Sequence, residues 1–184
     1  MIFQQKLEDE LNKLPEGWIV IIETRAEEST EVTLESLNIL IQRGYRGIVI
    51  SANRPYQNLI DIYNQSGIDT KKIYVVDCIS KAYGVDLEDA ENVVYVQNVA
   101  SLTDLSVSLN KMIGEVDGKR FIFIDSITTM LIHNRPEVFV KFIHSILTKM
   151  RIHKISGLLL SLETETDTEI KAEILQLCDK VIKL

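Results

Sequence analysis

The feature that most constrains the fold is a regular alternation of short apolar runs with longer segments of helical periodicity. The runs are too short for helices, and they predict strands at 18–22, 47–52, 73–77, 92–96, 120–125, 156–162 and 180–184. Between them, apolar residues recur every three or four positions, which predicts helices at 30–42, 55–65, 102–114, 136–153 and 168–177. Strands that alternate with helices form a parallel sheet covered on both faces. The predicted fold class is therefore α/β, with a parallel sheet between two layers of helices.

The domain organisation predicted from the sequence is a single domain spanning residues 1–184, because this length suits one core. Ahead of the first predicted strand, apolar residues at helical spacing predict an amphipathic helix over about residues 2–14. Pro15 and Gly17 end it. We expect this helix either to contact a partner or to cover the sheet.

Composition excludes several classes of function. The net charge is -7, so the surface as a whole repels nucleic acid and anionic lipid. The apolar runs are far shorter than the ~20 residues of a membrane span. Cys78 and Cys178 lie far apart without a CxxC companion, which argues against a disulfide framework or a zinc site and fits a reducing cytosol. We therefore expect a cytoplasmic protein, with Cys78 as a small core residue rather than a reactive thiol.

Two strand ends are the candidate positions for a ligand, because ligands of open parallel sheets bind beyond the carboxyl ends of the strands. One is the loop after Ile22, which leads to a helix starting at Thr30, and the other is Asp125, followed by Ser126. A strand, a loop and a helix, with a later apolar strand that ends in Asp-Ser, is the layout of a P-loop nucleotide-binding protein.

With these motifs the chain resembles the RecA superfamily, and its KaiC-like branch in particular. The resemblance covers about residues 17–184 and rests on GWIVIIETRAEEST, GYRGIVISANRPYQNL, FIFIDSITTML, LLLSLE and CDKVIKL. It implies a RecA/KaiC-like core in which Thr30, Asp125 and Ser126 would contact a nucleotide if one bound. It also implies relatives that assemble as rings or filaments, and it suggests an archaeal setting.

The loop departs from the family's G-x-x-x-x-G-K-[ST] pattern at nearly every position. Glu23 and Glu28 stand at the two glycine positions and Ser29 at the lysine position, and only Thr30 matches. The glycines let backbone N–H groups face the phosphates, and the lysine offsets the phosphate charge. The stretch 51–55, where relatives carry an acidic residue that activates water, contains no carboxylate. We therefore predict no ATP hydrolysis and no bound cofactor.

The acidic residues of this loop allow two interpretations. In the first, the helix dipole favours acidic residues in the first turn, and Glu27, Glu28 and Glu31 stand at such positions. One of these carboxylates would then occupy the anion site that phosphate fills in relatives. Alternatively, Glu23, Glu27, Glu28 and Asp125 would bind Mg²⁺ or Ca²⁺. Without a nucleotide, Asp125 is expected to accept hydrogen bonds from nearby loop N–H groups.

Other candidate sites have weaker support. The loop 163–169 corresponds to the region where recombinase relatives approach DNA, but it is strongly acidic, so we expect no nucleic-acid binding and only an N-cap at Asp167 or Thr168. His133, His144 and His153 lack the spacing of metal ligands.

The leading hypothesis is a non-catalytic RecA/KaiC-like protein that acts through protein–protein contact as a regulatory or assembly subunit. Its partner would be a second copy or an active paralogue. One alternative is a module that binds a nucleotide or another small ligand weakly through Thr30 and Asp125. A second alternative is a metal-dependent enzyme that uses the acidic loop.

Overall fold

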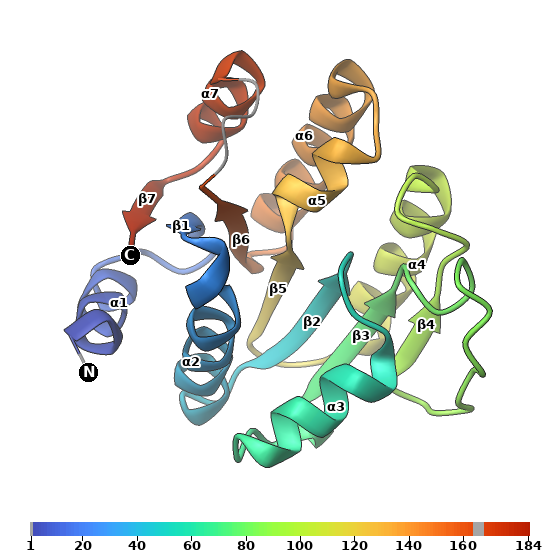
Figure 1. The fold of residues 1–184 in the computed structure, drawn as a ribbon. Coiled ribbons are helices and arrows are strands. Elements are labelled where there is room, and N and C mark those ends of the chain that lie inside the picture. Colours follow the sequence, from blue (N-terminus) through green and yellow to red (C-terminus); the bar gives the residue numbers. More distant parts are fainter. Residues whose placement is uncertain (1, 164–167) are drawn as a thin grey trace.

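The computed structural model describes residues 2–163 and 168–184 (Figure 1). Within these residues the strands are β1 (Ile19–Thr24), β2 (Arg46–Ser51), β3 (Ile73–Asp77), β4 (Val93–Tyr95), β5 (Arg120–Asp125), β6 (Ser156–Leu162) and β7 (Lys180–Lys183). The α-helices are α1 (Ile2–Asn12), α2 (Ser29–Gln42), α3 (Tyr56–Gln65), α4 (Leu102–Glu115), α5 (Ile127–Ile132), α6 (Pro136–Ile152) and α7 (Thr168–Gln176). Two short 3₁₀ helices, η1 (Ala26–Glu28) and η2 (Thr70–Lys72), precede α2 and β3.

The strands form one parallel sheet in the order β4-β3-β2-β5-β6-β1-β7. The predicted parallel α/β sheet is therefore confirmed. The first strand of the chain lies inside the sheet, where Glu23 pairs with Ser161 of β6 and Lys183 of β7. Because all strands run the same way, their carboxyl ends meet at one edge, and the loops that follow β1, β2 and β5 lie close together.

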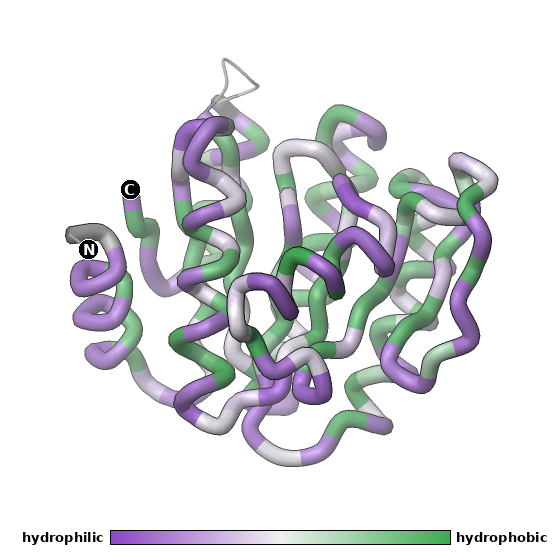
Figure 2. Tube along the Cα trace, turned by 60° about the horizontal axis from the view of Figure 1, so that its bottom comes forward, coloured by the Kyte–Doolittle hydropathy of each residue, from purple (hydrophilic) through white to green (hydrophobic). Residues whose placement is uncertain are grey.

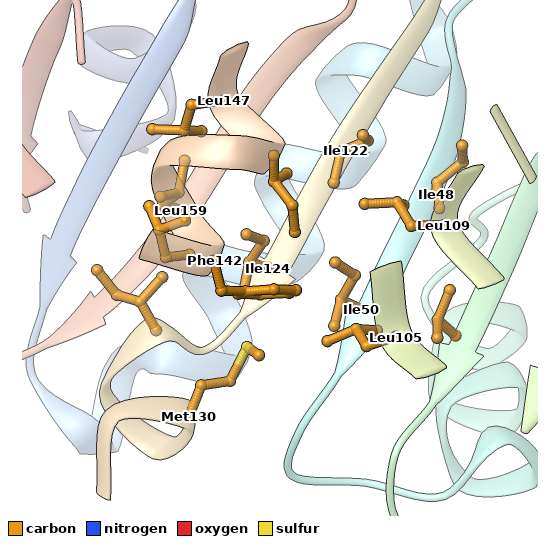
Figure 3. Packing of buried hydrophobic residues seen from close by; sticks show 14 of the residues in the cluster. Ile48, Ile50, Leu105, Leu109, Ile122, Ile124, Met130, Phe142, Leu147 and Leu159 are labelled. Carbon is orange, nitrogen blue, oxygen red and sulfur yellow. The ribbon is translucent and has the colours of Figure 1, made fainter. Parts of the chain in front are cut away.

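Helices cover both faces of the sheet, and each face has its own apolar core. Helices α1, α2 and α3 pack on one face, and α4, α5, α6 and α7 pack on the other. In Figure 3, β2 and β5 direct Ile48, Ile50, Ile122 and Ile124 toward Leu105, Leu109 and Phe142 of α4 and α6. Alternate residues of the same strands, among them Val49 and Phe123, enter the core of the opposite face. Burial on both faces explains why these strands are continuously hydrophobic in sequence.

Glycine makes room for a large neighbouring side chain at two points of the sheet. A Cβ atom added at Gly47 would lie 2.4 Å from Cζ of Phe121, and one at Gly157 would lie 2.3 Å from Cε of Met150. Any larger residue would displace the Phe121 ring or the α6 side chain. These two strand glycines therefore make room for packing.

The helix α1 covers the sheet at the β7 end, beside α2 (Figure 1). Its Leu7 and Leu11 are buried in the core formed with α2, and its Glu10 forms an ion pair with Lys180 of β7. The outer turns of the helix are hydrophilic (Figure 2). Of the two roles expected for this helix, covering the sheet is confirmed. It ends at Asn12, slightly before the predicted boundary.

Two elements differ from the prediction. The strand β1 continues to Thr24, beyond the predicted end at Ile22, because Glu23 and Thr24 keep pairing with β6. The helix α5 was not predicted, since six residues are too few for a helical period to be evident. Among the described residues, no helix is both long and apolar enough to cross a membrane.

Candidate functional site

The loop between β1 and α2 closes on itself. It is limited to four residues, Arg25–Glu28, three of which form the 3₁₀ turn η1. The Ser29 hydroxyl donates a hydrogen bond to the Ala26 carbonyl over 2.8 Å. The Arg25 guanidinium forms an ion pair with Glu28, and its Nε lies 3.3 Å from a Glu28 carboxylate oxygen. The side chains that stand where a phosphate loop has its lysine and second glycine therefore bind the loop itself.

Glu23 does not belong to this loop, so its predicted place there is wrong. It lies on β1, is only 7% exposed, and faces α7 on the far side of the sheet. Its carboxylate forms ion pairs with Lys171 of α7 over 2.7 Å and with Lys183 of β7 over 3.5 Å. The two ammonium groups compensate a buried carboxylate, which is otherwise strongly unfavourable.

The remaining carboxylates neither cap α2 nor gather into a metal site. Glu28 stands at the N-cap of α2, but its carboxylate pairs with Arg25 and makes no capping hydrogen bond. Glu31 lies in the first turn of α2, as the helix dipole favours. In the part of the chain that the structure describes, no group of three or more His, Cys, Asp or Glu side chains is placed to hold a metal ion. The hypothetical metal site that combines Glu23 with Asp125 is therefore not formed.

Asp125 ends β5 at the centre of the carboxyl edge. Its Oδ1 accepts a hydrogen bond from Nδ2 of Asn53 over 3.1 Å, and Oδ1 of Asn53 accepts one from the Thr129 hydroxyl over 2.7 Å. The expected partners, loop N–H groups, are replaced by this side-chain amide. Burial raises the pKa of Asp125, and the Asn53 hydrogen bond and the nearby charge of Arg54 oppose that rise only in part.

Ser126 has a structural role at the start of α5. Its side chain is buried, and its oxygen accepts a hydrogen bond from the Thr129 backbone N–H over 3.2 Å, which caps the helix. Ser126 does not line the cavity formed by the other two predicted site residues, Thr30 and Asp125.

A cavity of about 230 Å³ lies between α2 and α3 at the carboxyl edge. It brings Thr30 and Asp125 together, as the predicted site requires. Its other lining residues are Ser29, Thr33, Leu34, Asn53, Arg54, Leu59, Ile62, Tyr63, Leu160 and Leu162. The cavity is therefore aliphatic along its walls and contains hydroxyl groups, one carboxylate and one guanidinium.

Tyr63 is a residue of this cavity that no sequence pattern singles out. Its side chain is 1% exposed, yet its hydroxyl has no hydrogen-bond partner among the described residues. Burial is the main cause that raises the pKa of Tyr63, and the negative charge of Asp125 adds to it. As one of several apolar or aromatic residues on the inner face of α3, it is indistinguishable in sequence from an ordinary core residue.

The carboxylate of Asp77, at the end of β3, is fully buried and serves the fold. Its oxygens accept hydrogen bonds from the backbone N–H groups of Tyr56, Ile79 and Ser80 over 2.7–2.8 Å, and from the Ser80 hydroxyl over 2.6 Å. It thereby fixes the start of α3 and the turn after β3. The neighbouring Cys78 is fully buried, and burial raises the pKa of its thiol to about 12, which confirms the predicted core role.

The predicted acidic loop 163–169 is only partly described. Glu163 is exposed, whereas residues 164–167, among them the predicted N-cap Asp167, lie outside the described residues. Thr168, the other predicted N-cap, is the first residue of α7. The exposed side chains of His133, His144 and His153 contribute to no metal-binding group in the described ranges.

The parallel sheet, its strand order and the strand–loop–helix unit that places Thr30 beside Asp125 define a P-loop-type fold of the RecA class. A model of the KaiC ATPase family matches residues 18–184. The chain belongs to that family.

Solved structures agree with this assignment at the level of the fold. An uncharacterised protein from Pyrococcus horikoshii, solved in complex with an unknown peptide, aligns with a TM-score of 0.73 at 16% identity, over 97% of this chain and 82% of its own. A KaiC-like protein from the same archaeon aligns with a TM-score of 0.65 at 14% identity, over 93% of this chain and 72% of its own. No curated protein matches the sequence.

Proposed function

We propose that this chain is a KaiC-family protein that does not hydrolyse ATP and that acts through protein–protein contact as a regulatory or assembly subunit. The observation that carries the proposal is the closed loop before α2. A phosphate-binding loop needs free backbone N–H groups and a lysine directed at the ligand. Here Ser29 stands at the lysine position and binds Ala26, and Arg25 is paired with Glu28.

The position of the general base supports the same conclusion. The stretch after β2 offers Asn53, an amide, whose two polar atoms are already bonded to Asp125 and Thr129. An amide does not accept a proton from water at neutral pH. Phosphoryl transfer depends on positioning and charge stabilisation, and both would have to come from groups that this loop and strand end do not present.

An interaction role draws support from the fold comparison. The uncharacterised Pyrococcus horikoshii protein was solved in complex with an unknown peptide, so a chain of this fold can bind a polypeptide. We infer that this protein binds either a second copy of itself or an active KaiC-like paralogue.

The first test is ATP turnover by the purified protein with Mg²⁺. We expect no phosphate release above background, and no difference between the wild type and Asp125→Asn. Turnover that Asp125→Asn abolishes would overturn the proposal, because only an active site that holds its metal through Asp125 depends on that carboxylate.

The second test measures assembly. Analytical ultracentrifugation across a range of concentrations is expected to show a dimer or larger assembly, or else a defined complex with a purified active paralogue whose ATPase rate changes. A protein that stays monomeric and leaves the paralogue's sedimentation and rate unchanged would contradict the interaction role.

Weak nucleotide binding is the second candidate function, because Thr30 and Asp125 line one cavity. A ligand that binds only the folded state raises the unfolding midpoint. A thermal-shift series with ATP, ADP and cyclic nucleotides, each with and without Mg²⁺, therefore separates this candidate from a purely protein-binding role.

A further inference from the structure

The unpartnered Tyr63 hydroxyl is the strongest sign of a ligand in this molecule. Buried hydroxyl groups in native proteins nearly always have a hydrogen-bond partner, because leaving one unpaired is unfavourable. Tyr63 is 1% exposed, its hydroxyl has no partner in the part of the chain that the structure describes, and the residue lines the cavity between α2 and α3. A polar group of a bound molecule would satisfy it.

Two charged side chains of the same cavity also have unused hydrogen-bonding capacity. Asp125 binds Asn53 through Oδ1, and its Oδ2 receives no hydrogen bond from the described residues. Arg54 donates through Nη1 to Asn58 over 3.1 Å, and its other N–H groups bind no described residue. One carboxylate and one guanidinium on a single small cavity complement a ligand that carries both an ammonium and a carboxylate group.

The walls define the rest of the ligand. The aliphatic residues are Leu34, Leu59, Ile62, Leu160 and Leu162, contributed by α2, α3 and β6. The cavity measures about 230 Å³, below the 300–1,000 Å³ that is typical for drug-sized ligands. It therefore suits a small molecule with a short aliphatic body.

We propose that this cavity binds a free α-amino acid with a branched aliphatic side chain. The ammonium group binds Asp125 and the Tyr63 hydroxyl, the carboxylate binds Arg54, and the side chain lies between α2 and α3. This proposal goes beyond the absence of ATP hydrolysis and does not depend on it, because amino-acid binding requires neither a phosphate loop nor a general base.

The test is calorimetric titration of the full chain with L-leucine, with L-leucinamide and with 4-methylpentanoate. Leucinamide lacks the carboxylate and 4-methylpentanoate lacks the ammonium group. We expect saturable binding of L-leucine, and affinities at least about tenfold lower for the other two, since each leaves one charged group of the cavity unpaired. Absence of saturable L-leucine binding up to about 10 mM would overturn the proposal.

Two matched tyrosine variants on α3 test the role of Tyr63. Tyr63→Phe is expected to weaken L-leucine binding about tenfold while the unfolding midpoint of the empty protein stays equal or rises, because the lost hydroxyl had no partner. Tyr56→Phe removes a hydroxyl that donates to Asn92 over 2.7 Å, outside the cavity. It is expected to lower the midpoint and to leave binding unchanged. Equal effects of the two variants on binding would contradict the assignment.

A third variant does not depend on the buried core. Arg54 is only partly buried, so Arg54→Gln is expected to fold. It should bind L-leucine and L-leucinamide with similar affinity, because the group that distinguishes them is gone. Persistent discrimination would overturn the assigned orientation. An ATP titration completes the set: binding of ATP that Tyr63→Phe weakens, without L-leucine binding, would assign the cavity to a nucleotide instead.

Discussion

Two residues of the cavity, Asp125 and Tyr63, are held in environments that lower the stability of the folded protein. Asp125 is a partly buried carboxylate with a single side-chain hydrogen bond, and the buried hydroxyl of Tyr63 is unpaired among the described residues. Asp77, by contrast, accepts four hydrogen bonds and serves only the fold. Groups that weaken the folded state without a structural return are typical of functional sites. The contrast between these carboxylates separates the candidate site from the scaffold.

Replacing Asp125 by asparagine is expected to raise the free energy of unfolding at pH 7 by about 1 kcal/mol, because it removes a partly buried negative charge. Burial raises the pKa of Asp125 in the folded state above its unfolded value. Its contribution to stability is therefore complete below about pH 4 and is lost as the pH rises through the folded pKa. The gain from Asp125→Asn should accordingly disappear in acid.

Urea unfolding at a series of pH values checks this prediction. Asp86→Asn, at an exposed carboxylate, is the control and should change stability by less than about 0.5 kcal/mol at any pH. If Asp125→Asn lowered stability at neutral pH, the carboxylate would be a stabilising part of the scaffold.

At the scale of elements, the strands and long helices could be predicted because each has a clear apolar period. The ends of the strands and helices were harder to predict where tertiary contacts override local polarity. The charge of Glu23 is typical of a loop residue, yet ion pairs with Lys171 and Lys183 stabilise it within β1. The helix α5 is short and owes its position to packing of Ile127 and Met130 against the core.

The ion pairs of Glu23 anchor α7 to the sheet. Glu23→Gln is expected to lower the free energy of unfolding by about 1–2 kcal/mol, because it leaves the partly buried Lys171 without its carboxylate. Amide hydrogen exchange in α7 should accelerate more than in α6, since local opening follows local contacts.

Glu31→Gln, at an exposed carboxylate in the first turn of α2, is the matched control. It loses only a helix-dipole interaction, worth roughly 0.3–1 kcal/mol. Equal destabilisation by the two variants would show that Glu23 contributes no more than a surface charge.

At the scale of the molecule, two residues of the candidate site followed from the sequence. Thr30 and Asp125 were predicted because they lie at strand and helix ends that the parallel topology brings together. Tyr63 and Arg54 were not predicted, because the packing of α3 beside α2 determines which side chains of this region face the cavity. Ser126 fits the family motif, but it is used to cap α5.

The role of α1 is tested by its deletion. Removing residues 1–12 is expected to lower the free energy of unfolding by about 3–5 kcal/mol, because Leu7 and Leu11 lose their burial against α2. The exposed core face should also make the truncated protein self-associate in analytical ultracentrifugation. A change in assembly without loss of stability would instead identify α1 as a partner contact.

The position of β1 has a consequence for how the chain folds. Its hydrogen-bonded neighbours are β6 and β7, which begin at Ser156 and Lys180. During synthesis, the apolar segment Ile19–Thr24 is therefore made long before the strands with which it pairs. Pairing between strands that are distant in sequence slows folding, and it leaves the apolar surface of β1 exposed on the nascent chain. We infer that β1, β6 and β7 become ordered in the same late step of folding.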